Sequence, residues 1–476
     1  MTTYLLAIDG GSQSTKVSVV DETGAVHAAA QAPLRPYRLG ADGQATHPDD
    51  DLWDTLVLAA RQALAAFAGD PSEIVAVGLC SIRFCRVMVG ADGRLAEPVL
   101  SWMDARVSQP LGAVDPAVEL VTSATGYLAV RLTGNRRDSA ASYQGMWPKD
   151  PVSGQWSTDP AELERTGMPV RLLSDLVEPG DLLGQITPEA ARETSIPAGL
   201  PVYATANDKA VEALGSGLLD AGPMLLSLGT YIAAMTVGED PARRDDHYWV
   251  NAASVPGSYL YESGGIRRGM WTVSWLRHLV SAAAPDHVDQ RAVQKWLDDG
   301  ALRVSPGSGG LLTVPDWLAP GHAPYRRGTI LGLDGSHGAH HLYRSILEGI
   351  ALTMRGHTDA MEDALGGTPR RLVVSGGGAR SDLMMQVVAD VFGRPAERTA
   401  VSDAAGTGAA ICAAVGHGVY PGFEAAVAAM VRRGDEFAPD PAAQRQYASL
   451  RTVYAQVTEH TDKLYGQLET LRTVEN

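Results

Sequence analysis

The sequence lacks long apolar runs and basic clusters, and it has little cysteine. Three of its 476 residues are cysteine (Cys80, Cys85 and Cys412), and they form no Cys-x-x-Cys pair. This content is typical of a reduced compartment and argues against a zinc cluster. No stretch reaches the roughly 18–20 apolar residues that span a bilayer, and the first residues lack the basic segment of a secretory signal. We therefore expect a cytoplasmic protein with no membrane partner.

Acidic side chains outnumber basic ones. The chain has 55 Asp and Glu against 39 Lys and Arg, which gives a net charge of −16. Without a basic surface to neutralise phosphates, nucleic acid is not an expected partner. An anionic small molecule is not excluded, because a local pocket can be positive on an acidic protein. The 45% apolar and 20% charged content is ordinary for a soluble globular enzyme, and the length favours two or three domains.

Two similar segments each predict a β-hairpin. Residues 4–20 suggest a buried strand, a glycine turn and a second strand, and residues 225–238 repeat this order about Gly229. Self-similarity at a separation near half the chain suggests two related domains. Residues 404–416 are rich in alanine and glycine, and their small side chains predict a closely packed helix.

The turn at 221–223 marks the predicted domain boundary, which gives domains at residues 1–221 and 222–476. Within the first domain, residues 111–200 carry short apolar segments among Pro, Gly, Asp and Ser, and predict an irregular periphery. Apolar residues at helical spacing from about 441 to 472 predict a final helix docked on the body.

The tip of the first hairpin has the composition of a phosphate-binding turn. Glycine lets backbone N–H groups approach an anion, hydroxyls add donors, and lysine adds charge. The residues concerned are Gly11, Ser12, Gln13, Ser14 and Lys16. Asp9, at the end of the first strand, is placed to hold Mg²⁺, through water because Mg²⁺ keeps much of its hydration shell. No P-loop sequence occurs in the chain, and a plain hairpin turn is the alternative interpretation.

Two further glycine turns offer donors of the same kind. Gly229 and Thr230 form the tip of the second hairpin, although taken alone they are most simply an ordinary turn. The second turn follows a predicted strand and precedes a helix, whose N-terminus favours an anion or a nucleotide edge. Its residues are Gly376, Gly377, Gly378 and Ser381. They do not form a dinucleotide fingerprint, because Ser381 stands where the last glycine would be.

Asp208 is the most specific single candidate for catalysis. It stands between a predicted strand and a predicted helix, in the sequence ANDKAVEALGSG. An acid placed there can accept a proton from a substrate hydroxyl, an assistance of about 10²–10⁴ in rate. The alternative is a structural role, because Asp is a favoured N-cap. In isolation the cap is the simpler interpretation.

Taken together, in this order and spacing, these segments resemble the FGGY family of carbohydrate kinases. Residues 9–21 and 226–238 resemble the family's two phosphate hairpins, and residues 204–217 resemble its catalytic-Asp segment. Residues 374–393 with 403–418 resemble its adenosine segment. The resemblance spans roughly residues 4–420. It implies an α/β fold of two actin-like domains, each a mixed sheet with flanking helices, around a central cleft.

The resemblance also implies an activity. The protein would transfer a phosphoryl group from ATP, with Mg²⁺, to a hydroxyl of a small sugar or polyol, and Asp208 would be the general base. The hairpin tips would hold the ATP phosphates, with the sugar on the first domain and adenosine on the second. The rival interpretations are an actin-like ATPase that works with partner proteins and a catalytically silent sugar sensor.

The predicted acceptor pocket departs from the family pattern. Many xylulokinase-like members carry Gln-Met-His-Gly where this chain has Ser-Ile-Arg-Phe-Cys at 81–85. Arg83 is similar to the glycerol kinase pattern, but Phe84 replaces the acid that follows it there. Trp102 and Asp104 also fit the family's sugar pocket.

A shortened segment is a further departure. Only 20 residues separate Arg106 from Tyr127, whereas the family usually carries a longer helical insertion with substrate contacts at this place. We predict a pentulose as the acceptor, with a short polyol such as glycerol or a tetritol as the alternative because of Arg83. A homodimer is one option for the assembly.

Overall fold

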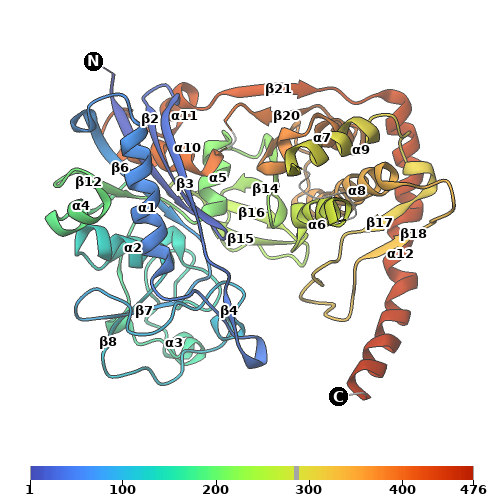
Figure 1. The fold of residues 1–476 in the computed structure, drawn as a ribbon. Coiled ribbons are helices and arrows are strands. Elements are labelled where there is room, and N and C mark those ends of the chain that lie inside the picture. The colour runs from blue at the N-terminus through green and yellow to red at the C-terminus, as the bar shows by residue number, and fades with distance from the viewer. Residues whose placement is uncertain (1, 283–288, 402, 475–476) are drawn as a thin grey trace.

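The computed structural model describes residues 2–282, 289–401 and 403–474 and has two lobes, each built on a mixed β-sheet (Figure 1). The first sheet has the order β11 (Leu182–Gln185), β12 (Pro201–Ala204), β6 (Ile74–Ser81), β1 (Tyr4–Gly10), β2 (Ser14–Asp21) and β3 (Val26–Pro33). The second has the order β15 (Tyr248–Ala252), β16 (Tyr259–Ser263), β14 (Ile232–Gly238), β13 (Pro223–Leu228), β19 (Arg371–Ser375), β20 (Ala396–Thr399) and β21 (Arg433–Phe437).

The two sheets share one plan. β1 pairs antiparallel with β2 and parallel with β6, just as β13 pairs antiparallel with β14 and parallel with β19. The next strands correspond as well, since β12 is parallel to β6 and β20 is parallel to β19. Both predicted hairpins are present, and this duplicated topology supports the relation between domains that their similarity suggested.

Short strand pairs and helices surround the sheets. The pairs are β4 (Arg38–Leu39) with β5 (Ala45–Thr46), β7 (Val87–Gly90) with β8 (Val118–Thr122), β9 (Arg137–Ser139) with β10 (Asp175–Val177), and β17 (Leu312–Val314) with β18 (Thr329–Leu331). The first lobe has the helices α1 (Asp51–Ala66), α2 (Ala124–Thr133), α3 (Pro160–Thr166) and α4 (Pro188–Thr194). The second has α6 (Gly269–Ala282), α7 (Gln290–Ala301), α8 (Ala339–Leu365), α9 (Asp382–Phe392) and α12 (Pro441–Val474).

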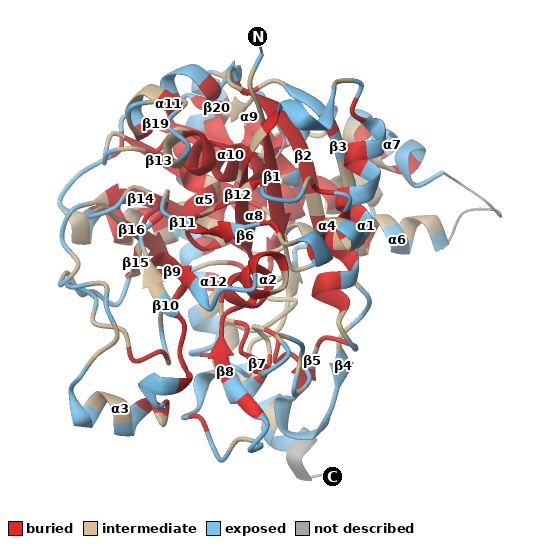
Figure 2. Cartoon of the chain, turned by 90° about the vertical axis from the view of Figure 1, so that its left-hand side faces the viewer, coloured by how far each residue is buried: buried red, intermediate tan, exposed pale blue. Residues whose placement is uncertain are grey.

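Three helices form a layer between the two sheets. α5 (Asp208–Gly215) packs against α10 (Ala404–Gly416), which also contacts β1, β6 and β12, and α11 (Phe423–Met430) lies against α10. A β-carbon on Gly408 would lie 2.0 Å from the carbonyl oxygen of Val211, so only glycine permits this approach. The small residues at 404–416 therefore serve close packing, as predicted. Buried residues concentrate in this layer and in the strands beside it (Figure 2).

Residues 111–200 are more regular than predicted, because they contain α2, α4 and β11, which is an edge strand of the first sheet. The final helix is present as α12, which packs against α8 and α9 along the outer side of the second lobe (Figure 1). The domain division stays a prediction: β13 begins at Pro223, but α10 lies on the first sheet. Among the described residues, no helix has both the length and the apolar character that crossing a bilayer requires.

Candidate active site

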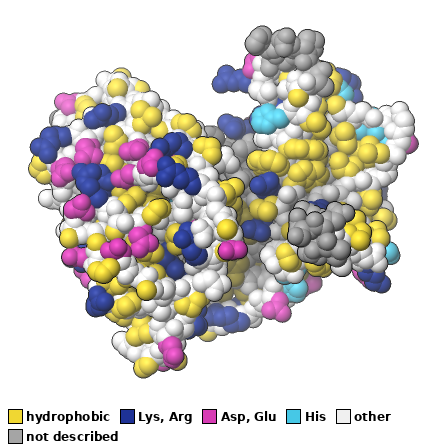
Figure 3. Space-filling model, turned by 60° about the horizontal axis from the view of Figure 1, so that its bottom comes forward, with side chains coloured by type: hydrophobic (Ala, Val, Ile, Leu, Met, Phe, Trp, Pro, Cys, Tyr) yellow, Lys and Arg dark blue, Asp and Glu magenta, His cyan; other side chains and the backbone are white. Residues whose placement is uncertain are grey.

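A cavity of about 330 Å³ lies between the lobes, and Figure 3 shows the groove that separates them on one face. Its walls come from the ends of β1 and β6, the starts of α5 and α10, the tip between β13 and β14, and β15. Most of the predicted site residues line it: Asp9, Gly11, Ser12, Lys16, Arg83, Phe84, Trp102, Asp208, Gly229, Thr230 and Gly376. Residues more than 300 positions apart in the sequence thus meet at one pocket.

The tips of the two hairpins touch. Gln13 Nε2, from the first lobe, donates a hydrogen bond of 2.7 Å to Thr230 Oγ1 of the second. The N–H of Gly11 donates to the carbonyl oxygen of Ser14 and closes its turn, which leaves Ser12 at the pocket wall. One anionic group can therefore meet donors from both lobes at this point.

Two carboxylates and one ammonium group share the floor of the pocket. Lys16 Nζ lies 3.4 Å from Asp9 Oδ2 and 3.2 Å from Asp403 Oδ1. Burial and the negative charge of Asp403 together raise the pKa of Asp9 to about 7, although the positive charge of Lys16 opposes the shift. Two acids that one lysine only partly neutralises suit a divalent cation. Within the described ranges no three His, Cys, Asp or Glu side chains gather as a metal site, so most ligands of such an ion would be phosphate or water oxygens.

Asp208 is free of the structural role that its sequence context allowed. The N-cap of α5 is Asn207, whose side chain accepts hydrogen bonds from the N–H groups of Lys209 and Ala210. Asp208 is the first residue of the helix, and its side chain is 26% exposed, at the pocket. It accepts a bond from the N–H of Lys209 at 3.0 Å, and its Oδ1 lies 3.8 Å from Arg83 Nε. Burial raises its pKa, while the positive charges of Arg83 and Lys209 lower it.

Arg83 links the two lobes at the end of the pocket. Its Nη1 and Nη2 donate hydrogen bonds of 2.7 Å to the two carboxylate oxygens of Glu262 on β16, whose side chain is fully buried. The guanidinium also lies 4.6 Å from the ring centroid of Trp249. Phe84 stacks on that ring at 5.7 Å, with its own φ at +64°, in the left-handed region that non-glycine residues seldom adopt. The bidentate pair leaves only Nε of Arg83 directed at Asp208.

A buried network that the sequence did not predict lies beside Asp208. Lys209 Nζ donates to Glu212 at 2.9 Å and to Ser227 Oγ at 2.6 Å. Glu212 also accepts from Ser227 and from Ser375 Oγ, at the ends of β13 and β19. This network ties α5 to the second sheet just below the phosphate turns. The i, i+3 spacing of Lys209 and Glu212 was the one signal for it in the sequence. Tyr231, Trp249 and Asp403 also line the pocket and were not among the predicted site residues, although residue 403 begins the segment that resembles the family's adenosine site.

Some predicted residues lie outside the pocket lining. Asp104 has a fully buried carboxylate that accepts from the N–H groups of Ala45 and Arg106 and from the Arg106 guanidinium. All of its bonds are structural, so we do not retain Asp104 as an acceptor-binding residue. Ser381 caps α9, and Ser14 Oγ accepts from Gln31. Gly377 and Gly378 also lie outside the lining; they form the turn that brings Gly376 to the pocket wall.

The comparisons with known proteins agree with this geometry. Residues 4–115 match the FGGY family of carbohydrate kinases, N-terminal domain, and residues 224–417 match its C-terminal domain. An Escherichia coli (strain K12) protein named uncharacterized sugar kinase YgcE is 44% identical over 462 residues, which cover 96% of this chain and 94% of that protein. A xylulose kinase of Lactococcus lactis is 25% identical, with 98% of each chain covered.

Solved structures show the same architecture. The crystal structure of xylulose kinase from Rhodospirillum rubrum superposes with a TM-score of 0.82 at 26% identity, and the match covers 97% of this chain and 100% of that one. The predicted pair of actin-like domains around a cleft is therefore confirmed. The chain belongs to the FGGY family of carbohydrate kinases, phosphotransferases whose acceptor is a sugar hydroxyl.

Proposed function

We propose that this carbohydrate kinase transfers the γ-phosphoryl group of ATP to a neutral small sugar or polyol, with a pentulose as the first candidate. The observation that carries the proposal is that the carboxylate of Asp208 and both hairpin tips line one pocket. Relatives named xylulose kinases support the choice of a pentulose. A glycerol- or tetritol-type polyol is the second candidate, because Arg83 lies at the same pocket.

Asp208 carries the acid–base step. It accepts the proton of the acceptor hydroxyl as that oxygen forms its bond to the γ-phosphorus and the bond from phosphorus to the ADP oxygen breaks. The raised pKa of Asp208 makes its carboxylate a better base than an exposed one. The positive charges of Arg83 and Lys209 oppose that rise in pKa and favour the ionised carboxylate.

The hairpin tips and Lys16 stabilise the charge of the phosphoryl oxygens. Ser12 and Thr230 offer hydroxyls and Lys16 an ammonium group on the pocket wall. Asp9 and Asp403 are the side chains that would hold Mg²⁺, which supplies further positive charge at the phosphates. Closing of the lobes over both substrates would exclude water and limit hydrolysis of ATP.

The acceptor is proposed to be neutral because Arg83, at the end of the pocket beside Asp208, is already paired. Both terminal nitrogens of Arg83 bind Glu262, so a substrate carboxylate would have to displace a buried carboxylate. The other walls there are the rings of Phe84, Trp102, Trp249 and Tyr231, which suit the C–H faces of an uncharged sugar.

An acceptor panel in an ADP-coupled assay tests this proposal. We expect one neutral compound among xylulose, ribulose, fructose, glycerol and erythritol to stimulate ADP release strongly, and gluconate to give no stimulation. ADP release that no acceptor stimulates would favour an actin-like ATPase. If no ADP is released with any acceptor, a sensor would be favoured. Preference for gluconate would contradict the proposal of a neutral acceptor.

Replacing Thr230 with valine is expected to weaken the binding of ATP far more than the binding of the acceptor. The change removes a hydroxyl from the phosphate turn and the bond from Gln13, and a hydrogen bond to a charged group is worth roughly ten- to a hundredfold in affinity. Steady-state KM values for ATP and for the acceptor make the comparison. Thr452→Val, at an exposed threonine on α12, is the matched control. Equal changes in the two KM values would remove Thr230 from the phosphate site.

A further inference from the structure

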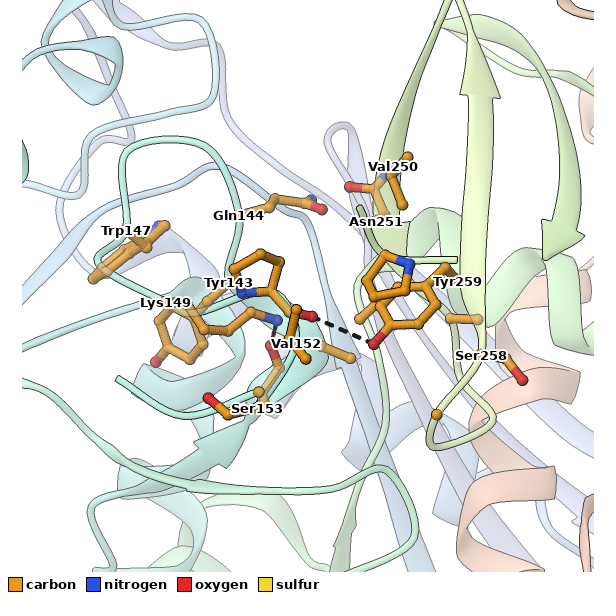
Figure 4. Close-up of a pocket in the computed structure, with 18 of the residues that line it drawn as sticks. Tyr143, Gln144, Trp147, Lys149, Val152, Ser153, Val250, Asn251, Ser258 and Tyr259 are labelled. Carbon is orange, nitrogen blue, oxygen red and sulfur yellow. Dashed lines mark hydrogen bonds between the residues drawn. The ribbon is translucent and has the colours of Figure 1, made fainter. Parts of the chain in front are cut away.

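A second cavity, of about 480 Å³, lies where the two lobes meet and shares no lining residue with the active-site pocket. Figure 4 shows its walls, a loop of the first lobe at 140–154 and, from the second lobe, β15 and the start of β16. Its volume is that of a small-molecule site. The lobes touch beside it, because Tyr259 Oη donates to the carbonyl oxygen of Pro151 at 3.3 Å.

Two amide side chains in this wall have buried polar atoms without a partner. They are Gln144, at both Oε1 and Nε2, and Asn251, at Oδ1, and no hydrogen bond from the described part of the chain reaches these atoms. Asn251 is only 3% exposed. Gln144 comes from the first lobe and Asn251 from the second, and Figure 4 shows them pointing toward each other across the cavity. Buried polar atoms in native proteins are normally paired, so a ligand that bonds both amides explains them.

The chemistry of the wall indicates what such a ligand is. Its charges balance, with two basic and two acidic side chains: Lys149, Arg244, Glu162 and Glu178. Lys149 Nζ already donates to the carbonyl oxygen of Ala140 at 2.7 Å. The aromatic rings of the wall are those of Tyr143, Trp147 and Tyr259. Balanced charge argues against an ion, whereas amides beside aromatic faces suit a neutral molecule with several hydroxyls.

The cavity is connected to the active site by a short chain of contacts. Asn251 Nδ2 donates to Glu262 Oε2 at 3.4 Å, and Glu262 holds Arg83, whose Nε faces Asp208 at 3.8 Å. The stacked rings of Phe84 and Trp249 stand at the active-site end of this chain. A ligand that bonds both Asn251 and Gln144 contacts both lobes. It therefore favours the arrangement of the lobes in which the Arg83–Glu262 pair forms.

We propose that this cavity is a second binding site for a small neutral polyol or sugar, and that its ligand changes acceptor affinity through Asn251, Glu262 and Arg83. The binding part stands independently of the reaction. The effect on acceptor affinity rests on the proposed kinase function.

Calorimetric titration with xylitol, a neutral five-carbon polyol, tests the binding part on the full-length protein. Wild type is expected to bind one more equivalent than the variant Gln144→Met, which removes both amide atoms at similar length. Gln185→Met, at an exposed glutamine on β11, should bind as wild type does, and thermal unfolding checks that each variant is folded. An equal number of equivalents in wild type and Gln144→Met would overturn the proposal.

A kinetic measurement tests the coupling. Xylitol should change the acceptor KM of wild type severalfold and leave that of Gln144→Met unchanged. If xylitol only competes with the acceptor at the active site, its effect on the acceptor KM will persist in Gln144→Met. That persistence, or an unchanged acceptor KM in wild type, would overturn the coupling. Because the titration needs no turnover, a failure there leaves the kinase proposal intact, whereas absence of kinase activity leaves the titration valid.

Discussion

Replacing Asp208 with asparagine is expected to lower kcat by about 10²–10⁴, with much smaller changes in the KM values for ATP and acceptor. Asparagine keeps the size of the side chain and its place at the first residue of α5. It cannot take the proton of the acceptor hydroxyl, so the loss falls on the chemical step. An ADP-coupled assay at saturating substrates measures it, and Asp175→Asn, at an exposed acid on β10, is the matched control.

The same variant should fold as well as wild type. Burial raises the pKa of Asp208, and Arg83 and Lys209 offset the shift only in part. A carboxyl whose folded pKa is raised stabilises the fold when protonated, and that contribution is lost as pH rises through the folded pKa. At neutral pH a neutral asparagine removes the penalty, so the midpoint of thermal unfolding should be equal to or above that of wild type.

The pH profile gives an independent check on the role of Asp208. The acid limb of kcat/KM for wild type should lie above the ordinary aspartate pKa of about 3.9, because the base must be ionised and burial raises its pKa. The residual activity of Asp208→Asn should lack this limb. Near-wild-type turnover in the variant, or an unchanged limb, would show that another group takes the proton.

Local sequence patterns predicted the parts of the site that lie on single turns. Each phosphate hairpin is one strand–turn–strand unit, so its apolar runs and its glycine stand next to each other in the chain. The position of Asp208 at the start of a helix was predicted in the same way. The choice between a catalytic base and a helix cap was not predicted, because Asn207 and Asp208 are both good caps. Only the structure shows that Asn207 takes the capping role.

The rest of the site is assembled by contacts that no local pattern carries. Glu262 and Trp249 lie on adjacent strands of the second sheet, in segments that look like ordinary strands, and they reach Arg83 only because the lobes meet there. Asp403 reaches Lys16 across 387 positions of sequence. Asp104 is the opposite case, because it fits a family pattern but does not line the pocket. Its carboxylate instead accepts hydrogen bonds from the N–H of Ala45 and from the guanidinium of Arg106.

Replacing Arg83 with methionine is expected to destabilise the protein by about 3–5 kcal/mol, since it leaves a buried carboxylate without its charge partner. Glu262 is 0% exposed, and after the change it keeps the hydrogen bond from Asn251 Nδ2 at 3.4 Å but has lost both bonds from Arg83. The double variant Arg83→Met/Glu262→Met should regain much of that loss, because it removes both charges together. Denaturant unfolding of the three proteins makes the comparison.

Two further variants make the argument specific to this pair. Glu262→Met alone should lower the free energy of unfolding less than Arg83→Met does, because Arg83 can still turn to Asp208, 3.8 Å from its Nε. That turn would lower the pKa of the base and shift the acid limb of the pH profile downward. Lys295→Met breaks an exposed ion pair on α7 and should leave the midpoint where it is. If Arg83→Met unfolds at the same denaturant concentration as wild type, the pair does not hold the lobes together. The exclusion of acidic acceptors would then lose its physical basis, because Arg83 would be free to bind a carboxylate.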